Sequence, residues 1–405
     1  MKYTQYRFLF VGLIMLYSGM SLLQAQTTYS FEYLIGKTSA ANSWFPDLDA
    51  NQTASFSIGK KITDPQLNWA HYLNHPTVGI NLEYANFGNK DVLGSGYSLH
   101  PYLEVPILES TIKNLSWHTG IGISYFTQKY HPAENWQNKA VSTDYSWSFR
   151  TFLYYRLWHH SAFDTRLSLG YTHKSNGHTR WPNNGLNSFL AGINLQFGKS
   201  SEPKSTAEKS ILKSQYRYFS FETGIGSQSL SRLYVDALPV YSTGISYGTI
   251  YDNTFKLGLG LYYRFYQSYY DYIKAEREFI NDSYPWLKKN VFYNSSTYGI
   301  NTSAEILMNH VSIVAELGLN IDKPFYKIDY RINNEGYANG EYFPGEIDTK
   351  YWIKRFVSGK MGLKYYLWNT KNAPKYNLSI GALICSNLGQ ADYSELNIGF
   401  IHILK

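Results

Sequence analysis

The residues whose types and spacing could do chemistry lie in the stretch GYTHKSNGHTRWPNNGLNS, from Gly170 to Ser188. His173 and Ser175 are two residues apart in it, just before a turn rich in glycine, proline and asparagine. A serine hydroxyl alone is a weak nucleophile, but a neighbouring imidazole, whose pKa is ordinarily about 6.5, can take its proton near neutral pH. The pair therefore suggests a serine that a histidine activates as a nucleophile.

Such a site also needs a group that orients the histidine and a donor for the oxyanion that develops on the substrate. The turn supplies Asn183 and Asn187, and a main-chain N–H near Gly177. Asparagine and glycine are also ordinary turn residues, so turn formation is the alternative interpretation. For His173 and Ser175 the alternative is a polar pair at a membrane interface, satisfied by water or lipid headgroups.

A hydrophobic period of two dominates the chain and predicts β-strands. The segments TVGINLEYANF, LSWHTGIGISYF and FKLGLGLYYR each alternate apolar residues with polar residues or glycine. The same alternation places Leu167, Leu169, Tyr171, His173 and Ser175 on one face of a strand. The candidate pair therefore shares a face with apolar side chains.

Two architectures use such strands. A soluble sandwich packs the apolar faces inward, whereas a membrane barrel turns them towards lipid. Strands of about 9–11 residues and the many Tyr and Trp residues near strand ends favour the barrel. Residues 1–25 also look like a signal peptide, with Lys2 and Arg7 before a short apolar core and Ala25 at the cleavage point. In a barrel, His173 and Ser175 would project from the outer wall, near one membrane interface.

The chain also repeats itself. YSFE, LYYRLW and GYTHKSN in the first half are followed, in the same order, by FSFE, LKYYLW and GALICSN in the second half. Three matches in one order predict a duplication. The prediction is an all-β protein of two tandem, antiparallel transmembrane β-barrels of about eight strands each, at residues 26–198 and 216–405. Residues 199–215 are predicted to be a polar linker. A single sixteen-strand barrel is the alternative.

Composition excludes other classes. The formal net charge is +7 without a block of basic residues, so nucleic acid is a poor candidate partner. The single cysteine, Cys385, cannot form an internal disulfide. No cofactor and no metal site are predicted.

The candidate stretch resembles the PagL-type lipid A 3-O-deacylases, which are acyloxyacyl hydrolase-like outer-membrane barrels. The resemblance is carried by H-x-S-N, a short loop, N-x-G, and a polar residue fourteen positions after the histidine, and is specific over about Leu167 to Phe197. It implies an eight-stranded barrel in the bacterial outer membrane whose Ser-His-Glu site on the lipid-facing wall removes an ester-linked acyl chain from lipid A of lipopolysaccharide.

The resemblance also implies roles for individual residues. Ser175 would be the nucleophile and His173 the general base, and Asn183 falls where the family has an oxyanion-side asparagine. Asn176 and Gly177 continue the motif. The chain departs from the family at the acidic member, where it has Asn187.

In the second half, Ile384 replaces the histidine while Ser386 and Asn387 remain, so the second barrel is predicted to be a catalytically silent, degenerate copy. The alternative for the whole protein is a non-catalytic outer-membrane barrel with a structural, adhesive or small-solute role. Its function would then lie in long loops such as 129–141 and 333–345.

Overall fold

The computed structural model describes residues 27–40, 45–108, 111–112, 114–198, 213–275, 277–334, 336–338, 341–343, 347 and 349–404. The predicted signal peptide at residues 1–25, and residues 199–212 of the predicted linker, lie outside these ranges. The chain divides into two compact units, which are described separately.

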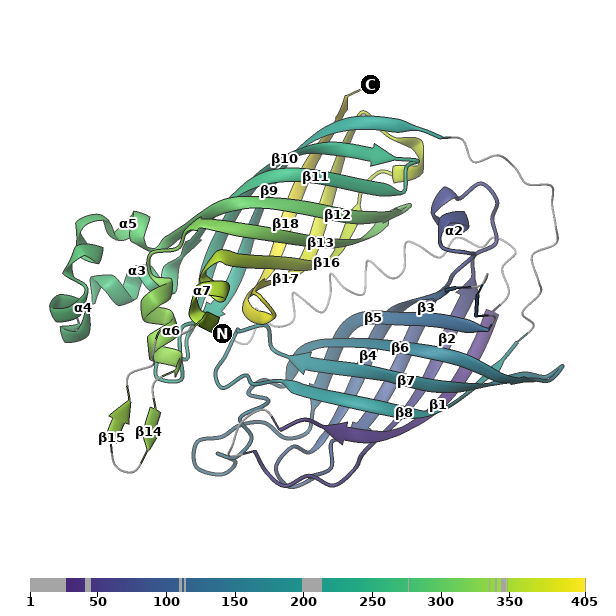
Figure 1. Ribbon diagram of the computed structural model, residues 1–405, viewed down its shortest axis with the longest axis horizontal. Helices are drawn as coiled ribbons and strands as arrows, with labels where there is room; N and C mark the ends of the chain where they lie inside the picture. Colours follow the sequence, from purple (N-terminus) through teal and green to yellow (C-terminus); the bar gives the residue numbers. More distant parts are fainter. Residues whose placement is uncertain are drawn as a thin grey trace. The chain divides into compact units, whose positions relative to one another are not determined.

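Eight antiparallel strands form the first barrel, and each pairs with its neighbour in sequence (Figure 1). The strands are β1 (Thr27–Thr38), β2 (Asn51–Lys61), β3 (Thr77–Asn86), β4 (Ser95–Pro106), β5 (Leu115–Phe126), β6 (Tyr145–His159), β7 (Phe163–Ser175) and β8 (Leu186–Phe197). Pairing of β1 with β8 closes the ring. A short helix, α2 (Asn68–Tyr72), lies in the connection between β2 and β3.

The second barrel also has eight strands. They are β9 (Gln215–Ser229), β10 (Ala237–Tyr251), β11 (Phe255–Tyr266), β12 (Ser296–Met308), β13 (Val311–Asp322), β16 (Val357–Tyr366), β17 (Tyr376–Asn387) and β18 (Gln390–Leu404). Pairing of β18 with β9 closes this ring. The prediction of two tandem eight-stranded barrels is confirmed, and the single sixteen-strand barrel is excluded because each half closes on itself.

Alternation along the strands gives both barrels an apolar exterior and a polar interior. On β1, Phe31 and Tyr33 are exposed, whereas Glu32 between them is buried. On β11, Leu257 and Leu259 are exposed and Lys256 is buried. Large apolar side chains on the outside of a closed sheet are costly in water but suit a lipid environment. The inward-packed sandwich is therefore wrong for this chain.

Helices and a hairpin connect the strands at one end of the second barrel (Figure 1). They are α3 (Gln267–Lys274), α4 (Glu278–Ser283), η1 (Pro285–Asn290), α5 (Val291–Asn294), α6 (Tyr326–Asn334), the hairpin of β14 (Gly336–Ala338) and β15 (Glu341–Phe343), and α7 (Thr349–Phe356). A further short turn, η2 (Thr370–Asn372), lies between β16 and β17. No helix in the described ranges is long and apolar enough to span a bilayer.

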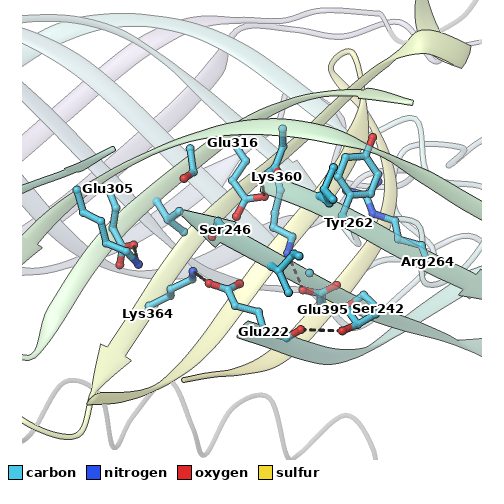
Figure 2. A pocket seen from close by; sticks show the side chains of 18 residues that line it. Glu222, Ser242, Ser246, Tyr262, Arg264, Glu305, Glu316, Lys360, Lys364 and Glu395 are labelled. Carbon is cyan, nitrogen blue, oxygen red and sulfur yellow. Dashed lines mark hydrogen bonds and ion pairs between the residues drawn. The ribbon is translucent and has the colours of Figure 1, made fainter. Parts of the chain in front are cut away.

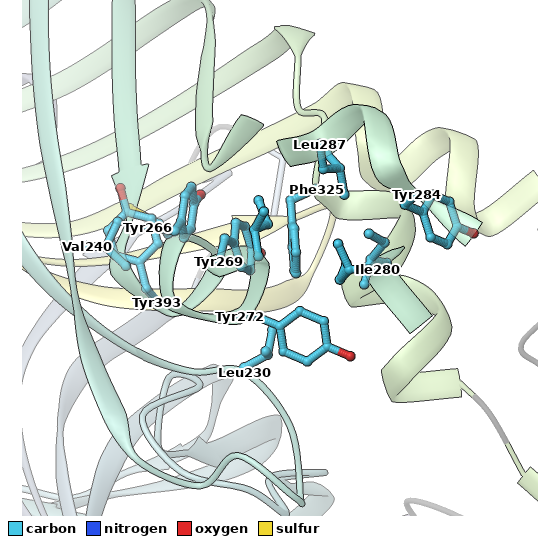
Figure 3. Close-up of a cluster of buried hydrophobic side chains, with 13 residues drawn as sticks. Leu230, Val240, Tyr266, Tyr269, Tyr272, Ile280, Tyr284, Leu287, Phe325 and Tyr393 are labelled. Atoms are coloured by element: carbon cyan, nitrogen blue, oxygen red, sulfur yellow. The ribbon is translucent and has the colours of Figure 1, made fainter. Parts of the chain in front are cut away.

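A buried aromatic cluster joins these helices to the strand ends (Figure 3). Tyr269 of α3 stacks between Tyr266 and Phe325, with ring centroids 4.6 and 4.3 Å away. Ile280 of α4 and Leu287 of η1 are fully buried in the same cluster. The Tyr-rich insert between residues 266 and 295 therefore forms a packed cap.

Candidate active site

Strands β7 and β8 position the candidate residues. In the antiparallel register, His173 lies directly opposite Asn187 on β8. On the other side, Trp147 of β6 lies opposite Ser175. Directly opposed residues have Cβ atoms about 4.5–5.5 Å apart, so their side chains can contact each other. The register therefore brings the predicted orienting residue to the histidine.

The residue between the pair anchors β7 from inside the barrel. Lys174 Nζ lies 2.7 Å from Glu83 Oε1, and both side chains are buried. Because successive strand residues face opposite sides, His173 and Ser175 point outward while Lys174 points into the lumen. Leu169 on the outward face is 60 % exposed. The candidate pair thus lies on the apolar outer wall, at the end of its strand.

Hydrogen bonds link the three candidate residues in series. His173 Nε2 lies 3.0 Å from Ser175 Oγ, and His173 Nδ1 lies 2.7 Å from Asn187 Oδ1. With a proton on Nδ1 donated to the amide oxygen, Nε2 carries the lone pair that faces the serine hydroxyl. This is the protonation state that a general base needs. His173 is half-buried and Ser175 is 7 % exposed, so bulk water has little access to the bond between them.

Tyr171 is a fourth residue of the hydrogen-bonded site, and the sequence pattern did not predict it. Its hydroxyl donates to Asn187 Oδ1 over 2.6 Å, so the same amide oxygen accepts from Tyr171 and contacts His173. The only indication of this role in the sequence is that Tyr171 lies on the same outward face as the histidine, two residues before it. A tyrosine on the outer wall of a barrel is ordinary, so this signal alone did not point to the site.

The loop between β7 and β8 holds the remaining predicted residues. Asn183 Oδ1 accepts from the main-chain N–H of Asn176 over 2.9 Å, and Asn176 Nδ2 donates to Ser142 Oγ over 3.0 Å. Gly177 has a φ of 64°, in the left-handed region that favours glycine. Asn183 and Asn176 therefore stabilise the loop directly after Ser175. In the described part of the chain, Nδ2 of Asn183 has no protein acceptor.

Gly185 brings the end of this loop against the site. Its φ is 72°, and a Cβ added there would lie 3.1 Å from His173 Cε1 and 3.0 Å from the carbonyl oxygen of Lys174. Its N–H donates to the carbonyl of Ala140 over 3.1 Å, which ties it to the loop between β5 and β6. A side chain at this position would strain the backbone and crowd the imidazole.

The seventh strand of the second barrel, β17, lacks this arrangement. Ile384 lies two residues before Ser386, and Ser394 of β18 lies opposite Ile384. The pairing register shifts between Cys385 and Ser386. Asn387 accepts from Lys323 Nζ over 2.9 Å, inside the barrel. No imidazole stands beside Ser386 on this strand.

The lumen of the second barrel contains a cavity lined by acidic and basic side chains (Figure 2). Their charges are paired: Lys256 with Glu305 at 2.9 Å, Lys360 with Glu395 at 3.1 Å, and Lys364 with Glu222. A lumen neutralised in this way attracts charged solutes less than a one-sign lining would. Among the described residues, no group of three or more His, Cys, Asp or Glu could hold a metal ion.

The fold defines the class of protein. Two closed antiparallel barrels with apolar exteriors and ion-paired interiors are outer-membrane β-barrels. Residues 60–196, which lie in the first barrel, match the family model described as Lipid A 3-O-deacylase (PagL). The predicted resemblance is thereby confirmed, and the chain is a protein of the bacterial outer membrane with a deacylase-like domain.

Solved structures that match the chain have low sequence identity to it. The structure of the outer membrane enzyme PagL matches with 13 % identity, 42 % of this chain, 98 % of that chain and a TM-score of 0.27. CdiB from Acinetobacter baumannii matches with 9 % identity, 95 % of this chain, 61 % of that chain and a TM-score of 0.17. OprB of Pseudomonas putida matches with 10 % identity, 94 % of each chain and a TM-score of 0.20. No curated protein matches the chain.

Proposed function

We propose that the first barrel is a serine ester hydrolase that removes an acyl chain from lipid A. Ser175 is the nucleophile, His173 the general base, and Asn187 the group that orients the imidazole. The observation that carries this proposal is the series of hydrogen bonds from Ser175 Oγ through His173 to Asn187 Oδ1, at 3.0 and 2.7 Å, on the lipid-facing wall of a PagL-family domain.

The reaction has two steps. Ser175 Oγ attacks the ester carbonyl carbon while its proton passes to His173 Nε2. The carbon–oxygen bond to the sugar then breaks, and the sugar hydroxyl leaves with the proton from the imidazolium. Water, deprotonated by His173, next attacks the acyl-serine, and the free fatty acid leaves as Ser175 regains its proton. Each proton that His173 accepts is returned within the cycle.

The tetrahedral intermediate needs donors for its oxyanion. We assign this role to Asn183 Nδ2 and the main-chain N–H of Gly177. The main-chain N–H of Asn176 already donates to Asn183, which leaves the Asn183 amide group as a donor. Removing one oxyanion donor from an acyl-transfer enzyme costs about 10²–10³ in rate. Asn176 supports the loop through Ser142 rather than contacting substrate.

The place of the site along the barrel fits a lipid substrate. The first barrel has two rims. Strand β1 begins and strand β8 ends at one rim, and Ser175 lies at the other. The longest connection of this barrel, residues 127–144, lies at the same rim as Ser175. In outer-membrane barrels the longer loops are extracellular. The site then lies at the level of the outer leaflet, and lipid A or lipopolysaccharide reaches it laterally within the membrane.

In this proposal the second barrel has no catalytic role. Ser386 has no histidine on its strand, and the residue opposite Ile384 is Ser394 rather than an asparagine or an acid. A serine without a base remains a weak nucleophile. The second barrel therefore supplies matched positions at which substitution leaves the reaction unchanged.

Mass spectrometry of lipid A from bacteria that express the protein tests the proposal. Wild type and Ser386→Ala are expected to yield lipid A that is lighter by one acyl chain. Ser175→Ala is expected to yield the unmodified species, at equal protein level in the outer membrane. If wild type and Ser175→Ala give the same lipid A, the enzyme proposal fails and the non-catalytic barrel stands.

A further inference from the structure

Tyr171 contacts the candidate site through a single well-defined bond. It lies on β7 two residues before His173, and its hydroxyl donates to Asn187 Oδ1 over 2.6 Å. Its ring packs against Phe189 of β8, with centroids 5.1 Å apart and an interplanar angle of 49°. The ring is therefore held by packing, and its hydroxyl is left to act on the amide.

An amide in the place of an acid creates a problem of orientation. A carboxylate presents an oxygen to the histidine whichever way it is turned, whereas an amide presents either an oxygen or an NH₂ group. If the NH₂ group faced Nδ1, the proton of the imidazole would lie on Nε2, and Ser175 would have no base. In a serine protease, replacing the acid by an amide costs about 10⁴ in rate because the wrong tautomer is fixed.

We propose that Tyr171 is a positioning residue that keeps the Asn187 amide oxygen turned towards His173. A phenol hydroxyl is a better donor than acceptor, so its bond to Oδ1 favours the orientation in which that oxygen also accepts from His173 Nδ1. The imidazole then keeps its proton on Nδ1 and its lone pair on Nε2. Tyr171 touches neither substrate nor the reacting atoms, and it acts through Asn187. This inference rests on the proposed function.

The second barrel supports the assignment of Tyr171 to the site. At the matching positions of β17 and β18, Ala382 replaces Tyr171, Ile384 replaces His173 and Ser394 replaces Asn187. The serine is retained as Ser386, and the asparagine that follows it as Asn387. The second barrel therefore lacks the tyrosine, the histidine and the orienting asparagine together.

A double-mutant cycle tests the inference, with rates of lipid A deacylation measured for the full-length protein in detergent. Tyr171→Phe keeps the ring and removes the donor. In the Asn187 background it is expected to lower kcat about fivefold, the value of one net hydrogen bond, with KM unchanged. In the Asn187→Asp background, whose two oxygens are equivalent, the same substitution is expected to change kcat by less than about twofold. An equal loss in both backgrounds would show a merely structural role and overturn the inference.

A second readout separates this inference from the proposed function. The ¹⁵N shifts of the His173 imidazole report which nitrogen is protonated, without substrate. Wild type is expected to carry the proton on Nδ1, and Tyr171→Phe to show a mixture with the Nε2 form. If the two proteins show the same tautomer, the inference fails whether or not Ser175→Ala is inactive. If the tautomer shifts but Ser175→Ala remains active, the proposed function fails and the positioning contact stands.

Discussion

The seventh strands of the two barrels, β7 and β17, occupy the same place in the barrel wall but carry different outward-facing side chains. Both alternate apolar outward residues with buried inward residues, and in both a serine near the end of the strand is followed by an asparagine. On β7 the outward face adds Tyr171 and His173, whereas β17 has alanine and isoleucine there. Closing a barrel needs only the alternation of faces. The difference therefore separates the residues that build the wall from those that the proposed hydrolase would need in addition.

The two barrels also differ in the inward-facing residue that lies just before the serine. Between the histidine and the serine of β7, Lys174 forms a buried ion pair with Glu83, but the matching position of β17 is Cys385, which is fully buried. An ion pair that spans the barrel fixes the strand more specifically than a small apolar side chain does. The first barrel thus has a rigid anchor directly beneath its candidate site.

The largest change in kcat is expected for substitution of Asn187, the residue that orients the histidine. Asn187→Ala removes the acceptor for His173 Nδ1 and is expected to lower kcat for lipid A deacylation by about a hundredfold or more. Asn187→Asp, which has the same shape and restores a charge, is expected to raise kcat above wild type. The control substitution Ile384→Ala, at the second-barrel position that matches the histidine, should leave kcat unchanged. Steady-state release of fatty acid measures all three, and an Asn187→Ala enzyme as fast as wild type would contradict the assigned role.

The next effect concerns stability. Lys174→Ala removes the cation 2.7 Å from Glu83 and leaves Arg150, 3.4 Å away, as the other cation beside that buried carboxylate. Breaking a buried pair costs about 3–5 kcal/mol, and because Arg150 remains we expect a loss at the lower end of that range. Cys385→Ala removes only a sulfur atom and is expected to cost about 1 kcal/mol. Denaturant unfolding of the purified protein, followed separately for each barrel by tryptophan fluorescence or a heat-dependent gel shift, measures both. Equal losses would show that the ion pair is no special anchor of the first barrel.

A smaller effect is expected at two glycines that follow the seventh strands. Gly185→Ala places a Cβ 3.1 Å from His173 Cε1 and is expected to lower kcat about five- to tenfold, because the imidazole must shift away from Ser175. The left-handed backbone adds a cost in stability of about 1–2 kcal/mol. Gly389 also has a positive φ, of 79°, but a Cβ there meets nothing within 4 Å. Gly389→Ala should therefore carry the backbone cost without any change in kcat. Matching losses of activity would refute the crowding argument.

The smallest effect belongs to the cap of the second barrel and depends on pH. Burial raises the pKa of Asp329 from an ordinary 3.8 to about 7. The folded cap therefore binds the proton more tightly than the unfolded chain does, and stability falls as pH rises between about 4 and 7. Protection factors for hydrogen exchange in α3 and α6, which correct for the base-catalysed intrinsic rate, should be lower at pH 8 than at pH 5. Asp329→Asn should reduce this difference and the exposed control Asp271→Asn should not; an unchanged profile in Asp329→Asn would contradict the assignment.

Much of the fold follows from the sequence because the period-two alternation is local. Predicted strand starts at Thr77 and Leu115 coincide with the first residues of β3 and β5. The outward face of the candidate pair follows from the same alternation, counted along one strand. The helices of the cap were harder, because each is short and packs through tertiary contacts rather than by a long amphipathic pattern.

The site was predictable only in part. His173, Ser175 and Asn187 stood out because their types and spacing match a known chemistry. Their hydrogen bonds depend on the pairing register of β7 with β8, which cannot be read from a local sequence pattern. The contact of Tyr171 with Asn187 requires that same register, and the pair of Lys174 with Glu83 joins strands far apart in the chain. Such contacts depend on how strands pair and face each other across the barrel, so local sequence patterns did not reveal them.

The central claim is that Ser175, activated by His173 on the outer wall, is a nucleophile and that its counterpart Ser386 is not. The most direct measurement is labelling of the folded protein with a long-chain alkyl fluorophosphonate, followed by peptide mass spectrometry. We predict one adduct, on Ser175, that disappears in His173→Gln and is absent from Ser386. An unlabelled Ser175, or equal labelling of the two serines, would contradict the account.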